Sequence, residues 1–192
     1  LIESFATAIE EHQFQVYYQP KFDIRPDTPI LTGAEALVRW FHPELGMISP
    51  GVFIPLFEDT GLIRKLDAYV WEEAARQISL WKKELGITIP VSVNVSRVDI
   101  AAPDMTDFIT KIVTENDLSP AEYMLEITES AYTSDSKHII EVVENLRPSL
   151  AKVLRLQLSI LHKTEDFLNR QSQAASLSTW YKDGQDGGED CC

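Results

Sequence analysis

The chain has 192 residues and a mass of 21.8 kDa, enough for one good-sized hydrophobic core. Apolar residues make up 44% and charged residues 24%, which is typical of globular domains and excludes a disordered or fibrous chain. The net charge of −13 disfavours duplex DNA or bulk RNA as the main partner, because an acidic surface repels the phosphate backbone.

Strand-like and helix-like segments follow one another along the chain up to Pro148. In chain order, the predicted elements are a helix at 2–12, strands within Phe14–Ile24 and at about 31–40, helices at Pro50–Glu58 and about 62–85, a strand at Val91–Val95, a helix around Phe108–Val113, a strand at 123–129, a helix at about Ser134–Arg147 and a strand at 152–160. Regular succession of strands and helices predicts an α/β fold with a parallel sheet and helical crossovers.

The last ten residues, 183–192, contain four acids and no base, and they are predicted to form a disordered acidic tail. Cys191 and Cys192 are the only cysteines, which excludes a disulfide framework and a Cys-x-x-Cys metal site. This cysteine usage fits a reducing cytoplasm, the predicted location. No stretch reaches the roughly 18 apolar residues of a membrane span.

Three predicted strands carry one oxygen-bearing residue each on the row opposite their most apolar row. Side chains of a strand alternate between two faces, so each strand divides into two rows. The three residues are Glu35, Asn94 and Glu126. If the apolar rows face the helices, these side chains converge on the other face of the sheet.

Two buried carboxylates and an amide need compensation, since an unpaired buried charge costs several kcal/mol. In one interpretation, arginines and backbone amides satisfy them as structural pairs. In the other, they bind a hard divalent cation such as Mg²⁺, Mn²⁺ or Ca²⁺, which prefers oxygen ligands. The spacing of the residues leaves both interpretations open.

Several motifs in series resemble one protein family. They are the segments Phe14–Phe22 and Gly33–Trp40, the pair His42-Pro43, the run Phe53-Ile54-Pro55, and the segments Val91–Ser96 and Leu125–Ser130. Their order and separations resemble the EAL family of cyclic-di-GMP phosphodiesterases, which is named after the tripeptide that stands here as Glu35-Ala36-Leu37. Residues 1–147 are thereby identified as the N-terminal part of an EAL domain.

This resemblance implies an incomplete (β/α)8 barrel of the TIM type, with about four to five βα units. It also implies metal-dependent hydrolysis of cyclic-di-GMP to pGpG, with Mg²⁺ or Mn²⁺ as the cofactor. By motif position, Glu35, Asn94 and Glu126 resemble the metal ligands. Glu129 resembles the glutamate that steadies a loop over the site, and with Glu35 it is the expected catalytic carboxylate.

Gln19 and Arg39 resemble the family's substrate contacts. Arg39 is suited to a two-pronged hydrogen bond to a phosphate oxygen, and its structural alternative is an ion pair with Glu35. The structural alternative for Gln19 is a hydrogen-bonded amide on the floor of the barrel.

The resemblance ends at Pro148. The family pattern continues with Asp-Asp-Phe-Gly-Thr-Gly and then a lysine, a glutamate and a glutamine from later strands, and residues 148–192 contain none of these motifs. Residues 148–182 are expected to be a divergent strand and helix segment. Hydrolysis of this kind uses two metals about 3.5 to 4 Å apart, so three donors predict negligible turnover by this chain alone.

The expected partners are cyclic-di-GMP and a second copy of the chain, because an unclosed barrel leaves a free sheet edge and exposed apolar surface. A chain that begins with Leu1 is expected to be part of a longer polypeptide with an upstream sensor or diguanylate cyclase domain. No nucleic-acid polymer is expected.

Three functional hypotheses remain open. The first is a divergent phosphodiesterase completed by a partner subunit. The second is a non-catalytic cyclic-di-GMP-binding or protein-interaction scaffold, and the third is the relic of a disrupted gene. The missing acidic motif favours the second and third hypotheses over the first.

Overall fold

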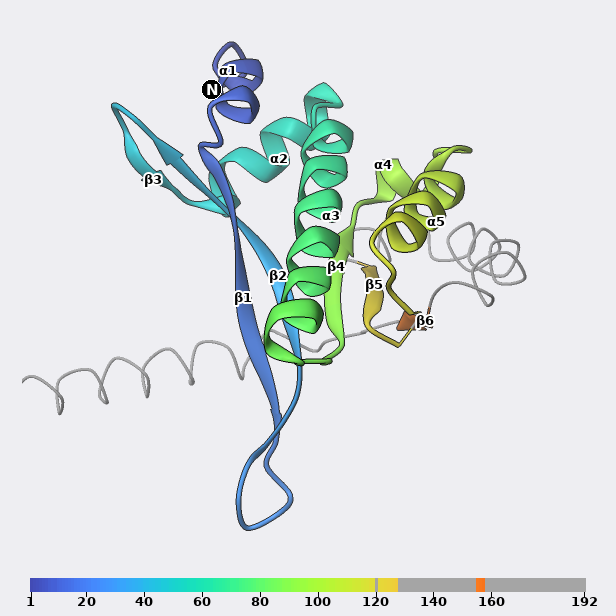
Figure 1. The fold of residues 1–192 in the computed structure, drawn as a ribbon. Coiled ribbons are helices and arrows are strands. Elements are labelled where there is room, and N and C mark those ends of the chain that lie inside the picture. Colours follow the sequence, from blue (N-terminus) through green and yellow to red (C-terminus); the bar gives the residue numbers. More distant parts are fainter. Residues whose placement is uncertain (120, 128–154, 158–192) are drawn as a thin grey trace, which may run out of the picture. The chain divides into compact units, whose positions relative to one another are not determined.

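The computed structural model describes residues 1–119, 121–127 and 155–157, and Figure 1 shows their arrangement. In chain order the elements are α1 (Phe5–Glu10), β1 (Phe14–Asp23), β2 (Ile30–His42), β3 (Gly46–Ile48), α2 (Pro50–Thr60), α3 (Ile63–Leu80), η1 (Trp81–Leu85, a π-helical turn), β4 (Val91–Val95), α4 (Arg97–Ile100), α5 (Met105–Glu115), β5 (Tyr123–Ile127) and β6 (Arg155–Gln157). The elements predicted for residues 1–127 are confirmed, and β3 and α4 are short additions.

Local signals at the ends of the helices explain these boundaries. Pro50 lies in the first turn of α2, where its missing N–H leaves no helical hydrogen bond unmade. Gly86 ends η1 in the left-handed conformation at φ 65°, which glycine adopts without steric cost. The predicted helix at 62–85 is therefore α3 extended by η1.

The described strands form a sheet in the order β1-β2-β4-β5-β6, with β3 paired to β2. β2, β4, β5 and β6 are parallel neighbours, which confirms a partial barrel of several βα units. The first pair differs from the predicted parallel pattern, because β1 and β2 are antiparallel. The six residues between them are too few for a parallel crossover, which takes a dozen or more.

Helices α3 and α5 cover one face of the parallel strands. The row formed by Ala34 and Ala36, together with the valines of β4, packs against buried residues of these helices such as Ala75 and Ile109. A second core cluster joins α1, α2 and β1 through the rings of Phe14 and Phe57. The apolar rows therefore face the helices, as predicted, and the opposite face carries the polar residues.

Several predictions concern residues outside the described ranges. They are the helix at Ser134–Arg147, the divergent segment 148–182 apart from β6, and the tail 183–192, and the expected homo-oligomer also stays a prediction. Within the described residues, no helix combines the length and the apolar character that crossing a membrane requires.

Gly33 allows β2 to approach β4 closely. A Cβ atom at Gly33 would lie 2.7 Å from Pro90 O, the same carbonyl that accepts a hydrogen bond from Ala34 N at 2.9 Å. We expect Gly33→Ala to lower the free energy of unfolding by about 1 to 3 kcal/mol, because the strands must separate. Urea denaturation measures this change.

The control is Gly51→Ala in α2, where the added methyl group would meet nothing closer than Ser49 Oγ at 3.7 Å. Alanine is favoured over glycine in helices, so this variant should be at least as stable as the wild type. Equal stability of Gly33→Ala and the wild type would contradict the close approach.

Candidate functional site

Glu35, Asn94 and Glu126 lie on the face of the sheet opposite α3 and α5. Glu35 lies beside Ser92 in the register between β2 and β4, and Asn94 lies beside Glu126 in the register between β4 and β5. Asn94 Nδ2 donates a hydrogen bond to Glu35 Oε1 at 3.1 Å. Glu35 and Glu126 are only 7% and 5% exposed, so the strands bring two nearly buried carboxylates and an amide into one neighbourhood.

Lys21 of β1 contacts this group of side chains. Its Nζ donates hydrogen bonds to Glu126 Oε2 and to Ser92 Oγ, both at 2.9 Å, and lies 3.9 Å from Glu35 Oε2. The cation described beside both carboxylates is thus a lysine, whereas the sequence suggested arginines and backbone amides. Strand alternation could have indicated Lys21, since it lies two residues from Gln19 on the same row.

The other predicted site residues are Gln19, Arg39 and Glu129, and only Gln19 lies directly beside one of the three donor residues. Gln19 is directly opposite Glu35 in the pairing of β1 with β2, so the two side chains are neighbours on one face. Arg39 lies four residues beyond Glu35 on the same row, and its Nη1 donates a hydrogen bond to Val38 O at 2.8 Å. Glu129 is outside the described residues.

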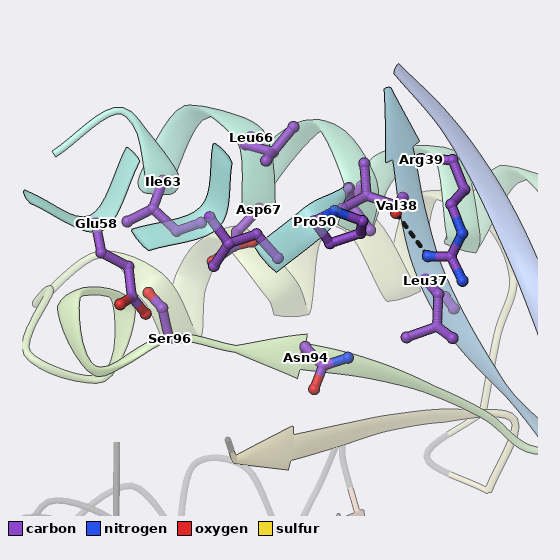
Figure 2. Close-up of a pocket in the computed structure, with 13 residues that line it drawn as sticks. Leu37, Val38, Arg39, Pro50, Glu58, Ile63, Leu66, Asp67, Asn94 and Ser96 are labelled. Atoms are coloured by element: carbon purple, nitrogen blue, oxygen red, sulfur yellow. Dashed lines mark hydrogen bonds between the residues drawn. The ribbon is translucent and has the colours of Figure 1, made fainter. Parts of the chain in front are cut away.

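A cavity of about 220 Å³ adjoins the site between β2, the end of β4, and helices α2 and α3. Figure 2 shows Arg39 at one end of it, and Glu58 and Ser96 together at the other. Asn94 belongs to the lining as well, so the cavity connects Arg39 with the donor group. A ligand that entered here would meet the Arg39 guanidinium and the Asn94 amide toward the sheet, the carboxyl groups of Glu58 and Asp67 at the helices, and apolar walls between them.

Two aspartates, Asp67 in the lining of this cavity and Asp99 at the start of α4, form a partly buried acidic pair. Asp99 is nearly inaccessible to solvent and accepts hydrogen bonds from the backbone N–H and the hydroxyl of Ser96, in a capping box at the start of α4. Burial raises the pKa of Asp67 well above its usual value, and the hydrogen bond and charge of Asp99 raise it further. The folded protein therefore favours the protonated form of the Asp67 carboxyl group. Sequence reasoning missed this pair, because its partners lie on different helices.

Helix α3 holds the ends of the site strands through two hydrogen bonds. Trp71 Nε1 donates to Asn94 O at 2.9 Å, and the buried Tyr123 hydroxyl donates to Trp71 O at 3.1 Å. These contacts fix β4 and β5 against the same turn of the helix. The backbone that carries Asn94 is therefore held from the apolar side of the sheet.

The donor set fits a hard divalent cation in its chemistry. Carboxylate and amide oxygens are the ligands that Mg²⁺ and Mn²⁺ prefer. Within the described residues, no group of three or more histidine, cysteine, aspartate or glutamate side chains is arranged to hold a metal, and the donors here are two carboxylates and one amide. The three donors on the described strands would fill only part of the coordination shell of such an ion.

We expect Asp67→Asn to stabilise the protein relative to the wild type as the pH rises. Because the pKa of Asp67 is raised in the folded state, the folded protein binds this proton more tightly than the unfolded chain does. The wild type therefore loses stability as the pH rises from the ordinary aspartate pKa to the raised one, while an asparagine loses none. Urea denaturation in mildly acidic and mildly alkaline buffers measures the difference.

Asp107→Asn, at an exposed position of α5, is the matched control and should change stability equally in both buffers. A constant difference between Asp67→Asn and the wild type across the two buffers would contradict the raised pKa of Asp67.

The EAL domain family model matches residues 2–154 of this chain. The bifunctional diguanylate cyclase/cyclic di-GMP phosphodiesterase MucR of Pseudomonas aeruginosa is 36% identical over 146 residues, which cover 76% of this chain and 21% of that protein. The cyclic di-GMP phosphodiesterase PA2567 of the same organism is 34% identical over 148 residues, 77% of this chain and 25% of that protein. The chain thus spans about a fifth to a quarter of the length of these curated relatives.

Solved structures agree with these matches. The structure of the PaMucR phosphodiesterase in complex with c-di-GMP has a TM-score of 0.70 and 30% identity, and the match covers 88% of this chain and 68% of that one. The EAL domain of FimX from Pseudomonas aeruginosa bound to c-di-GMP, at a TM-score of 0.69 and 19% identity over 89% of this chain and 66% of that one, supports the fold alone. On the family match and the shared fold, this chain belongs to the EAL domain family.

Proposed function

We propose that this chain is a cyclic-di-GMP-binding module of the phosphodiesterase type, with its site on the polar face of β2, β4 and β5. The observation that carries the proposal is the meeting of Glu35, Asn94 and Glu126 on one face of three parallel strands. The named activity of the relatives MucR and PA2567 supports the choice of cyclic-di-GMP as the substrate.

Glu35, Asn94 and Glu126 are the proposed ligands of a Mg²⁺ or Mn²⁺ ion. When bound, such an ion would polarise a phosphoryl oxygen and lower the pKa of water. The strands of this chain hold the three donor side chains in position. The low exposure of Glu35 and Glu126 keeps bulk water from competing with a ligand. Glu129 remains the proposed loop-positioning carboxylate.

Arg39 and Gln19 are the proposed substrate contacts. The Arg39 guanidinium borders the cavity, and a phosphate oxygen there would accept charge-assisted hydrogen bonds from it. Gln19 lies opposite Glu35 at the margin of the donor group, and its exposed amide is free to meet a polar edge of the dinucleotide. These two residues would contact the ligand from the β1–β2 side of the donor group.

Binding with little turnover is the form of this function that we favour for the chain alone. Residues 148–192 lack the acidic motif that the family places after the next strand, so one metal at most has its ligands here. In the metal-free protein, Lys21 supplies a positive charge among the carboxylates, which would lessen their repulsion of the dinucleotide's phosphates. An upstream cyclase domain and a homo-oligomer are further proposals for the longer protein.

We expect the purified chain to bind cyclic-di-GMP in calorimetry and to release little pGpG during incubation with Mn²⁺. The reason is that the substrate contacts are present while the second set of acidic ligands is not. Chromatography of the reaction mixture measures pGpG, and the MucR phosphodiesterase serves as the active reference. Rapid pGpG formation would refute slow turnover, and the absence of binding would refute the proposed function.

Arg39→Ala should weaken cyclic-di-GMP binding by about 10- to 100-fold, which is the usual strength of charge-assisted hydrogen bonds to phosphate. Arg76→Ala is the control, because Arg76 is an exposed arginine of α3 that pairs with Glu73 instead of bordering the cavity. An unchanged dissociation constant for Arg39→Ala would remove Arg39 from the ligand site.

A further inference from the structure

We propose that Lys21 is a built-in counter-cation that holds the two site carboxylates together in the metal-free protein and must move aside when a divalent cation binds. This inference rests on the metal role proposed above for Glu35, Asn94 and Glu126. It assigns a positioning role to a residue on β1, a strand that runs antiparallel to β2 at the edge of the described sheet.

The contacts of Lys21 place its ammonium group where a cation would be shared by both glutamates. Nζ lies 2.9 Å from Glu126 Oε2 and 3.9 Å from Glu35 Oε2, on carboxylates that come from two different strands. Ser92 Oγ accepts a third contact at 2.9 Å and lies 3.4 Å from Ala34 O. An ammonium ion held by three oxygens at the β2–β4 junction mimics part of the oxygen shell of a metal ion.

The sheet is built to let this lysine reach across it. Lys21 is paired with Gly33 on β2, so no side chain on β2 blocks the path at that position. The register between β1 and β2 shifts immediately after Lys21, and Thr32 Oγ1 donates a hydrogen bond to Lys21 O at 3.0 Å. These features aim the lysine stem over β2 toward β4 and β5.

The Lys21 side chain is also able to move away from the two carboxylates. Its side chain is 41% exposed, whereas the carboxylates that it contacts are 9% and 7% exposed as side chains. A long lysine side chain can therefore swing into water while the glutamates stay in place. Because two cations cannot occupy the same carboxylates without strong repulsion, metal binding and the Lys21 contacts exclude each other.

Removal of the lysine charge tests this competition. We expect Lys21→Met to bind Mn²⁺ about tenfold more tightly than the wild type in calorimetry, since a nearby positive charge no longer opposes the ion. In EDTA the same variant should have a lower melting temperature than the wild type, because the carboxylates lose the contacts with the Lys21 ammonium group. Added Mn²⁺ should then raise the melting temperature of Lys21→Met more than that of the wild type.

Lys82→Met is the matched control. Lys82 is also partly exposed and pairs with the buried Glu122 at 3.2 Å, but this pair lies before the start of β5, away from the donor group. The control should lose stability in EDTA to a similar degree and keep the Mn²⁺ affinity of the wild type. Equal Mn²⁺ affinity of Lys21→Met and the wild type, or no Mn²⁺ binding by either, would overturn the proposal.

A measurement on the wild type keeps the proposal testable if Lys21→Met fails to fold. Acylation of lysines by an N-hydroxysuccinimide ester, followed by peptide mass spectrometry, reports how accessible each ammonium group is. We expect labelling of Lys21 to increase when Mn²⁺ is added and labelling of Lys82 to stay constant. Labelling of Lys21 that does not change with saturating Mn²⁺ would overturn the proposal.

These readouts use Mn²⁺ alone, so they separate the inference from the proposed function. If the chain fails to bind cyclic-di-GMP while Lys21→Met gains Mn²⁺ affinity, the counter-cation role stands and the dinucleotide assignment falls. If the chain binds cyclic-di-GMP while the wild type and Lys21→Met have the same Mn²⁺ affinity, the dinucleotide assignment stands and the counter-cation role falls.

Discussion

The register between β2, β4 and β5 is the constraint on which the rest of this structure depends. Valines and alanines of these strands pack on α3 and α5, so every second residue must point the other way. A slip by one residue would turn Glu35, Asn94 and Glu126 into the helix-packed core and expose the valines. The hydrophobic core therefore sets the positions of the polar side chains, and the site needs no separate scaffold.

Charge balance is the second condition that the site must meet. Two glutamates with little exposure to water require positive charge or hydrogen-bond donors nearby, and in the described part of the chain Lys21 and Asn94 supply both. The same oxygens suit a divalent ion. In the proposed exchange, the ammonium group offsets one of the two carboxylate charges and a divalent ion offsets both, and the long lysine stem lets the ammonium group move away when the ion binds.

Contacts made by α3 also support the site from the helix-covered side of the sheet. Asp67 and Asp99 join α3 to the start of α4, and Trp71 joins α3 to the backbone of Asn94. The helix that covers the apolar face thus also fixes the end of β4, where a donor residue lies. Substitutions on α3 that leave the polar face untouched can change the site through these contacts.

The sequence by itself determined which residues share a face, because strand alternation depends only on local covalent geometry. It also located β4 to the residue, at Val91–Val95. The family motifs identified the fold and the candidate donors. Tertiary structure alone decided that β1 runs antiparallel to β2, that Lys21 meets Glu35 and Glu126, and that Asp67 pairs with Asp99. Such contacts join residues far apart in the chain, and their distances follow from packing that no local pattern encodes.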